Sequence, residues 1–144
     1  MSKRWGVAAL VALAVGSGAL REFLFVNLNY QLDHVARGTP FSYAHSLFQG
    51  WTQGIGTTGL TALKWAASFF FILLMTGLSV VAARLLFGDH RYLRLIAVAV
   101  CCVALLALLL HALSLEMAAV KLLHALQYPV ILLALVLVRP LARS

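Results

Sequence analysis

The residues with chemically reactive side chains are few, and most of them lie near the ends of apolar segments. Arg21 and Glu22 stand side by side near the end of the first apolar run, and Lys121 and His124 lie near the start of the last one. Residues three apart, such as Lys121 and His124, share one face of a helix. Carboxylate, ammonium and imidazole groups can pair as ions, relay protons or act as acid and base. We predict a polar cluster of Glu22, Lys121, His124 and His111 in the outer leaflet of a membrane.

The two charges of the Arg21–Glu22 pair are expected to have different environments. At about 100° per residue, Glu22 shares a helix face with the small residues Ala8, Gly18 and Ala19. Small residues let membrane helices approach closely, so Glu22 is expected to point into the bundle. Arg21 falls on the bulkier face of Leu10, Phe25 and Leu28, and its long stem is expected to reach the lipid headgroups.

We interpret the polar cluster as a clamp that fixes helix packing, because polar contacts hold membrane helices together. A proton or ion path is an alternative, although no acidic residue lies near the middle of any apolar run. A catalytic site is a further alternative, although the sequence has no strong hydrolase or transferase motif. Cys101 and Cys102 have no His or Cys partners at metal-binding spacing. We therefore predict no catalytic residue, no cofactor and no metal site.

The composition predicts that these residues belong to an integral membrane protein. Hydrophobic residues make up 63% of the 144 positions and charged residues 10%, with a mean hydropathy of +0.98. Soluble domains carry about 25% charged residues, so a soluble fold is excluded. The net charge of +7 comes from residues at the ends of apolar runs, without a basic and aromatic stripe. This pattern favours lipid over nucleic acid as the partner.

Four segments are long enough to cross a hydrocarbon layer, which takes about 20 residues of helix. They are residues 5–26, 65–83, 93–113 and 119–138. We predict an all-α membrane protein, a four-transmembrane-helix bundle in a single membrane domain over residues 1–144, with an outer loop at 27–63. Pro129 lies near the middle of the last segment and is expected to kink it.

The distribution of basic residues predicts the orientation. One side of the expected bundle carries seven Lys and Arg residues and the other carries four: Lys3, Arg4, Arg84, Arg91, Arg94, Arg139 and Arg143 against Arg21, Arg37, Lys64 and Lys121. The more basic side faces the cytoplasm. Both termini are therefore expected in the cytoplasm, in a bacterial inner membrane. Residues 1–19 also resemble a signal peptide, but the apolar run resumes at Phe23, which favours an uncleaved span.

The outer loop is expected to have some structure of its own. The first helix is expected to continue past the membrane, supported by the four-apart pair Asp33 and Arg37, until Gly38-Thr39-Pro40 ends it. The segment "FSYAHSLFQGW" then places aromatic side chains on one face of a short helix. This pattern predicts a helix that lies in the outer membrane interface. Its expected anchors, with Arg21 beside them, are Phe41, Phe48 and Trp51.

The layout resembles a family of small bacterial membrane proteins. The first span ends in "LREFLF", the second in "ARLLFGDHRYLR", and the fourth contains "LQYPVILL" before a basic tail. These features resemble the exosortase-system-associated proteins of Bacteroidetes. The resemblance implies an accessory role beside an exosortase, a membrane transpeptidase that processes sorting-signal proteins.

The expected function is therefore that of a non-enzymatic accessory subunit. It is expected to dock a membrane-protein partner through its small-residue helix faces and its outer loop, and the resemblance implies that this partner is an exosortase. A small transporter or channel component is one alternative, and a membrane enzyme with an outer-leaflet polar site is another. Polar residues repeated deep in the spans would favour transport, whereas copurification with a larger membrane enzyme would favour the accessory role.

Overall fold

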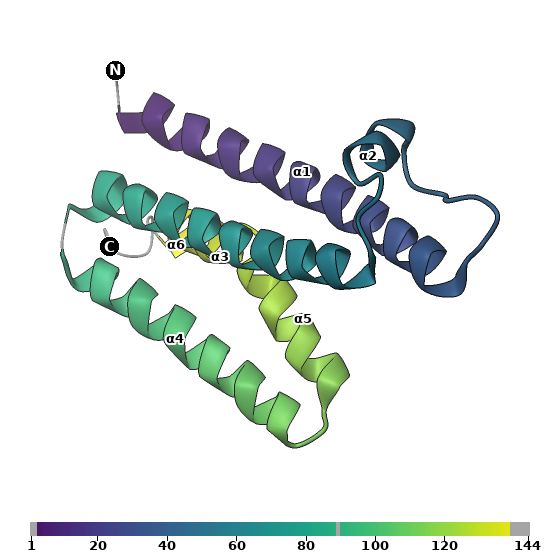
Figure 1. The fold of residues 1–144 in the computed structure, drawn as a ribbon. Helices are drawn as coiled ribbons and strands as arrows, with labels where there is room; N and C mark the ends of the chain where they lie inside the picture. The colour runs from purple at the N-terminus through teal and green to yellow at the C-terminus, as the bar shows by residue number, and fades with distance from the viewer. Residues whose placement is uncertain (1–2, 89, 139–144) are drawn as a thin grey trace. The chain divides into compact units, whose positions relative to one another are not determined.

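The chain folds into helices joined by short connections (Figure 1). The computed structural model describes residues 3–88 and 90–138, and within them it contains no strand. The prediction of an all-α fold is confirmed. The helices in chain order are α1 (Lys3–Arg37), α2 (Ser46–Trp51), α3 (Thr57–Phe87), α4 (His90–Ala112), α5 (Glu116–Leu126) and α6 (Val130–Val138).

Within the described residues, three helices are long and apolar enough to cross a membrane, namely α1, α3 and α4. The pair α5 and α6 passes the same criterion together, which makes four if the pair is one span. α1 has 35 residues, which corresponds to roughly 52 Å of helix. A hydrocarbon core is about 30 Å thick, so α1 is much longer than one crossing requires.

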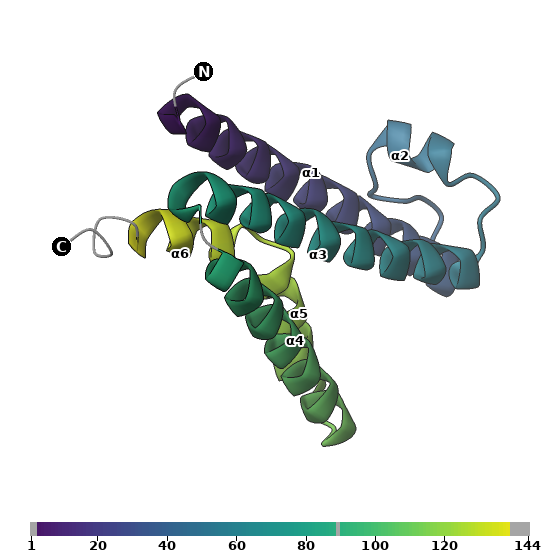
Figure 2. The ribbon, with the colours of Figure 1, turned by 90° about the vertical axis from the view of Figure 1, so that its left-hand side faces the viewer.

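The last apolar segment is broken rather than gently kinked. α5 and α6 meet at an angle of 58°, and the break covers Gln127, Tyr128 and Pro129 (Figure 2). Proline lacks a backbone N–H, and its ring clashes with the carbonyl four residues earlier, here that of Ala125. Tyr128 N–H donates to this carbonyl at 3.3 Å, and Leu133 N–H donates to the carbonyl of Pro129 at 2.9 Å to open α6. Pro129 was expected to kink one continuous helix, and the structure instead has two helices, α5 and α6, on either side of a break.

The chain divides into two compact units. Unit 1 contains residues 1–18 and 71–144, and unit 2 contains residues 19–70. In unit 1, α4 and α5 lie side by side (Figures 1 and 2). Two apolar clusters fill unit 1, one centred on Met75 and Leu132 and one on Ile96 and Leu135.

Unit 2 has its own small apolar core. Both views show α2 beside the later part of α1 (Figures 1 and 2). The buried residues of this core are Leu28, Ala44, Phe48 and Leu60, and Leu24, Leu32 and Ile55 pack around them. These side chains come from α1, the connection after it, α2 and α3. The segment between α1 and α3 therefore packs against both helices.

α1 ends where the sequence predicts. Gly38 adopts a φ of +62°, a left-handed conformation that glycine accepts without strain. Thr39 N–H then donates to the carbonyl of His34 at 3.3 Å, the six-residue closure common at helix C-termini. The ion pair between Asp33 and Arg37 is also confirmed, with 2.8 Å between Oδ1 and Nε.

Candidate functional site

The structure reverses the expectation for the charged pair on α1. The side chain of Arg21 is only 3% exposed, whereas that of Glu22 is 58% exposed. Arg21 Nη1 donates to Glu22 Oε2 at 3.0 Å, and the guanidinium lies over the ring of Phe25, 4.6 Å from its centre. Arg21 is thus buried against the helix, and the predictions that it is an interfacial anchor and that Glu22 points inward are wrong.

The cause of this reversal is the choice of the packed face of α1. Most buried residues of α1 recur three, four or seven positions apart, namely Val7, Ala14, Gly18, Arg21, Phe25 and Leu28, and Asn27 and Gln31 are buried beside them. Ala8, which shares the face of Glu22, stays exposed and lines a shallow groove with Val7, Val11, Ala12 and Gly16. The packed face thus holds small residues, Ala14 and Gly18, as well as the larger Phe25 and Leu28, so side-chain size alone does not select it.

The other members of the predicted polar cluster lie in unit 1, on the α4–α5 hairpin. His111 is in the last turn of α4, and Lys121 and His124 are on α5, each with an exposed side chain. His124 comes eight residues after Glu116, the first residue of α5, which is roughly 12 Å along the axis. His111 and His124 thus lie at different heights on the hairpin. Glu22 belongs to unit 2, so its contact with Lys121 or His124 stays a prediction.

A set of hydrogen bonds fixes the segment that follows α1. The buried amide of Asn27 accepts a hydrogen bond from His45 N–H and donates to the carbonyl of Phe23 at 2.7 Å. Ser42 Oγ donates to Gln31 Oε1 at 2.8 Å. α1 therefore holds the segment at two points, Asn27 and Gln31, one helical turn apart.

The helix predicted over residues 41–51 is shorter than expected. α2 covers only Ser46–Trp51, because local side chains take the backbone groups that a longer helix would need. Ser42 Oγ accepts from Ala44 N–H at 3.2 Å, and Gln49 Nε2 donates to the carbonyls of Ser42 and Ala44. His45 has an extended backbone, and its Nδ1 accepts from Leu47 N–H at 3.3 Å to cap α2.

The three expected aromatic anchors separate into two groups. Phe41 and Trp51 are exposed, as an interfacial role requires. Phe48 is only 3% exposed and packs in the core of unit 2 with Leu28 and Leu60. The prediction that Phe48 inserts into lipid is therefore wrong, because its ring is already enclosed by protein.

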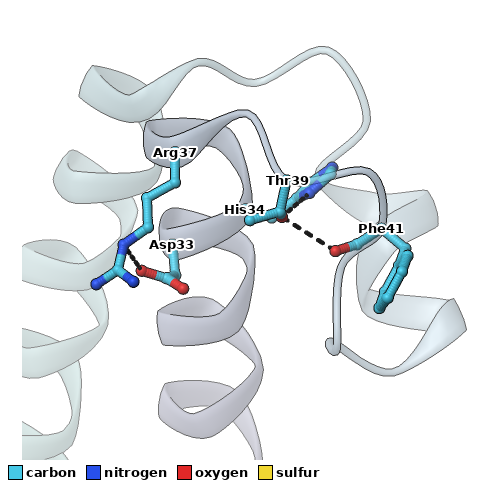
Figure 3. A network of polar contacts seen from close by, with 5 residues as sticks. All are labelled: Asp33, His34, Arg37, Thr39 and Phe41. Carbon is cyan, nitrogen blue, oxygen red and sulfur yellow. Dashed lines mark hydrogen bonds and ion pairs between the residues drawn. The ribbon is translucent and has the colours of Figure 1, made fainter.

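His34 is held in a defined orientation at the end of α1 (Figure 3). Thr39 Oγ1 donates its proton to the carbonyl of Phe41 at 3.1 Å. The same oxygen lies 2.8 Å from His34 Nδ1, so it accepts a hydrogen bond from the N–H of that nitrogen. In the neutral imidazole, Nε2 then carries the lone pair and is a hydrogen-bond acceptor. Sequence reasoning had assigned His34 no particular role.

A polar pocket lies beside this histidine, entirely within unit 2. Its volume is about 660 Å³ and it is open on one side. Its walls come from the end of α1, from α2 and from the glycine-rich turn before α3: Gln31, His34, Val35, Gln49, Gly50, Thr52, Gln53, Gly54, Ile55 and Gly56. Sequence reasoning missed this pocket. The four glycines within "GWTQGIGTTG" are the available signal in the sequence.

Exposed aromatic rings form a second feature of unit 2. The rings of Phe41 and Tyr43 meet edge to face with centres 5.4 Å apart, and those of Tyr43 and Tyr30 lie 6.2 Å apart. All three side chains are exposed. We call Tyr30, Phe41 and Tyr43 the aromatic cluster. Tyrosine and other aromatic residues are enriched where proteins bind one another.

The described residues contain no group of three or more His, Cys, Asp or Glu side chains that could hold a metal ion. Cys101 and Cys102 lie on α4 as free, exposed thiols. No family model, curated protein or solved structure matches the chain.

Proposed function

We propose that this protein is a non-enzymatic accessory subunit of a larger membrane enzyme and that it docks this enzyme through the aromatic cluster. The observation that carries the proposal is the contrast within unit 2. Hydrogen bonds that Asn27 and Gln31 accept from His45 and Ser42 hold the segment after α1 in place, yet Phe41 and Tyr43 remain exposed. Rigidly held aromatic side chains lose little entropy on binding and commonly dominate the energy of an interface.

The partner class comes from the resemblance of the sequence to exosortase-system-associated proteins. We propose a membrane transpeptidase of the exosortase type as the partner. In this arrangement the apolar helices of the accessory subunit lie in the bilayer, and unit 2 meets the outer face of the enzyme. Membrane helices that pack against an enzyme and a structured outer segment that contacts it would together support the enzyme without taking part in its chemistry.

The docking proposal is tested by copurification from native cells in a mild detergent. We expect the tagged chain to retain a membrane transpeptidase and Tyr43→Ala to lose it. An aromatic residue that dominates an interface contributes about 2 kcal/mol, which is roughly thirtyfold in affinity. Trp5→Ala is the matched control, because Trp5 is a similarly exposed aromatic residue in unit 1. Retention of the same enzyme by Tyr43→Ala, or its equal loss from Trp5→Ala, would contradict the proposal.

The proposal also includes a topology. We propose four spans, with α5 and α6 together as the fourth, both termini in the cytoplasm of a bacterium and residues 27–63 outside. Basic residues favour the cytoplasmic side, and seven of the eleven lie on that side of the proposed bundle. Arg139 and Arg143, two of these seven, lie outside the described residues.

Reporter fusions test this topology. Fusions after Arg37, Asp89 and Ser144 are expected to report outside, inside and inside, in that order. An outside signal at Ser144 would show that the α5–α6 pair enters and leaves the membrane on one face. The proposed fourth span would then be wrong.

A further inference from the structure

The pocket of unit 2 has the size and the fixed polar groups of a binding site. Its volume of about 660 Å³ lies within the range of roughly 300–1,000 Å³ that is usual for ligand pockets. Gln31, on its α1 wall, is only 7% exposed, and the bond from Ser42 holds its Oε1. Its NH₂ group makes no hydrogen bond to the described residues. Two donors are therefore available at a buried and immobilised position.

Histidine adds an acceptor to these donors. His34 donates through Nδ1 to Thr39, so its neutral ring has Nε2 free to accept a hydrogen bond. Gln53 adds an exposed side-chain amide, with a donor and an acceptor in one group. The pocket thus offers both partners that a peptide group needs, because each peptide group carries one N–H and one carbonyl.

At the glycines of the pocket, no side chain covers the backbone. A Cβ at Gly50, Gly54 or Gly56 would meet nothing within 4 Å. Only Gly54, with a φ of +77°, needs glycine for its conformation, at the third position of the turn that Ile55 N–H closes onto the carbonyl of Thr52. Gly50 and Gly56 have neither a positive φ nor a crowded Cβ position. Glycine at such places lets another molecule approach the backbone closely.

The lining also decides which class of ligand the pocket suits. No residue that lines it is Asp, Glu, Lys or Arg, so a charged ligand would find no counter-charge. The nearest charged residues of α1, Asp33 and Arg37, pair with each other on the side of α1 away from Thr39 (Figure 3). No Phe, Tyr or Trp ring, on which a sugar usually stacks, lines the pocket. An uncharged ligand rich in amide groups fits this lining better than a phosphate or a sugar.

We propose that the pocket binds a short, uncharged peptide segment in extended conformation. The amide groups of Gln31 and Gln53 bond to its peptide groups, Nε2 of His34 accepts one of its N–H groups, and the bare backbone at Gly50 and Gly56 lets it lie close. Val35 and Ile55 supply the apolar contacts of the lining. The segment belongs to the partner that docks at the aromatic cluster, so in this respect the inference rests on the proposed function.

The test uses the purified full chain in lipid nanodiscs, without any partner. The probe is N-acetyl-tetraalanine amide, which is uncharged and presents mainly peptide groups. Nuclear magnetic resonance of the labelled glutamine NH₂ groups and of the His34 ring follows the titration. We expect saturable shifts at Gln31, Gln53 and His34. We expect binding at least about tenfold weaker in Gly50→Ala and Gly56→Ala, because the added methyl group occupies the open space of the pocket.

Gly77→Ala is the matched control, because a Cβ at Gly77 also meets nothing within 4 Å and Gly77 does not line the pocket. Its affinity for the probe should equal that of the unchanged chain. None of the three variants should unfold at a lower temperature than the unchanged chain, because alanine favours the helix at Gly50 and Gly77. No saturable shift with the probe, or equal weakening in Gly77→Ala, would overturn the proposal. Tighter binding of methyl glucoside or of inorganic phosphate at the same resonances would also overturn it. Because no partner is present, failure here leaves the docking test with Tyr43→Ala unaffected.

Discussion

Replacing Phe48 with alanine is expected to unfold the segment between α1 and α3 while leaving the long helices intact. Phe48 is 3% exposed and lies at the centre of the small core of unit 2. Removing a buried phenylalanine ring costs about 3–5 kcal/mol, and few other apolar groups in this segment can replace it. Hydrogen exchange of the α2 amides and the rate of protease cleavage between residues 38 and 56 should both rise sharply.

Trp51→Ala is the matched control for this prediction. Trp51 lies three residues later on the same short helix, but its side chain is 67% exposed. Its removal should leave the exchange rates of α2 nearly unchanged. A larger effect of Trp51→Ala than of Phe48→Ala would mean that α2 is held by lipid through Trp51 rather than by the core around Phe48. The burial of Phe48 would then contribute little to the stability of α2.

Replacing Arg21 with methionine is expected to destabilise the protein more than replacing Glu22 with glutamine. Arg21 is buried, with its guanidinium over Phe25 and bonded to Glu22, whereas Glu22 is more than half exposed. A cation over an aromatic ring contributes about 0.5–2 kcal/mol, depending on how far it is desolvated. An ion pair with an exposed member contributes about 1 kcal/mol or less, because water screens it. The loss should therefore be about 1–2 kcal/mol for Arg21→Met and smaller for Glu22→Gln.

Thermal unfolding in detergent measures both losses, and a double-mutant cycle with Phe25→Leu isolates the contact between the cation and the ring. Couplings of polar groups in membrane proteins average about 0.6 kcal/mol and reach about 1.7, so a coupling in that range is the expected result. A greater loss for Glu22→Gln, with no coupling between Arg21 and Phe25, would support the inward-facing Glu22 that the helical wheel suggests.

The long helices could be predicted from the sequence because their causes are local. A run of apolar residues that avoids charge is a membrane helix whatever packs around it. The end of α1 at Gly38 and the break at Pro129 are also local, since a left-handed glycine and a missing N–H act on the backbone directly. These features depend on a few neighbouring residues. The start of α3 is less local, because the helix begins at Thr57, eight residues before the predicted segment 65–83.

The faces of the helices and the pocket could not be predicted in this way. Arg21 and Glu22 were placed on the correct sides of α1 relative to its other residues, but the choice of the inward side depends on what packs there. The burial of Phe48 depends on Leu28 and Leu60, which lie 20 residues before it and 12 after it. The pocket depends on the same long-range folding, because Gln31 and Gly56 meet only after the segment between them has closed.

The break between α5 and α6 has a consequence for the synthesis of the protein. α5 has 11 residues and α6 has nine, which correspond to roughly 16 Å and 14 Å of helix. Neither is long enough to enter a bilayer core of about 30 Å as a stable segment by itself. α5 packs along α4, whose 23 residues suffice for a crossing. In the proposed four-span topology, α5 would therefore enter the membrane as the second arm of a hairpin with α4 while the chain leaves the ribosome. A nascent chain halted after Leu126 would contain only half of the fourth span, held beside α4.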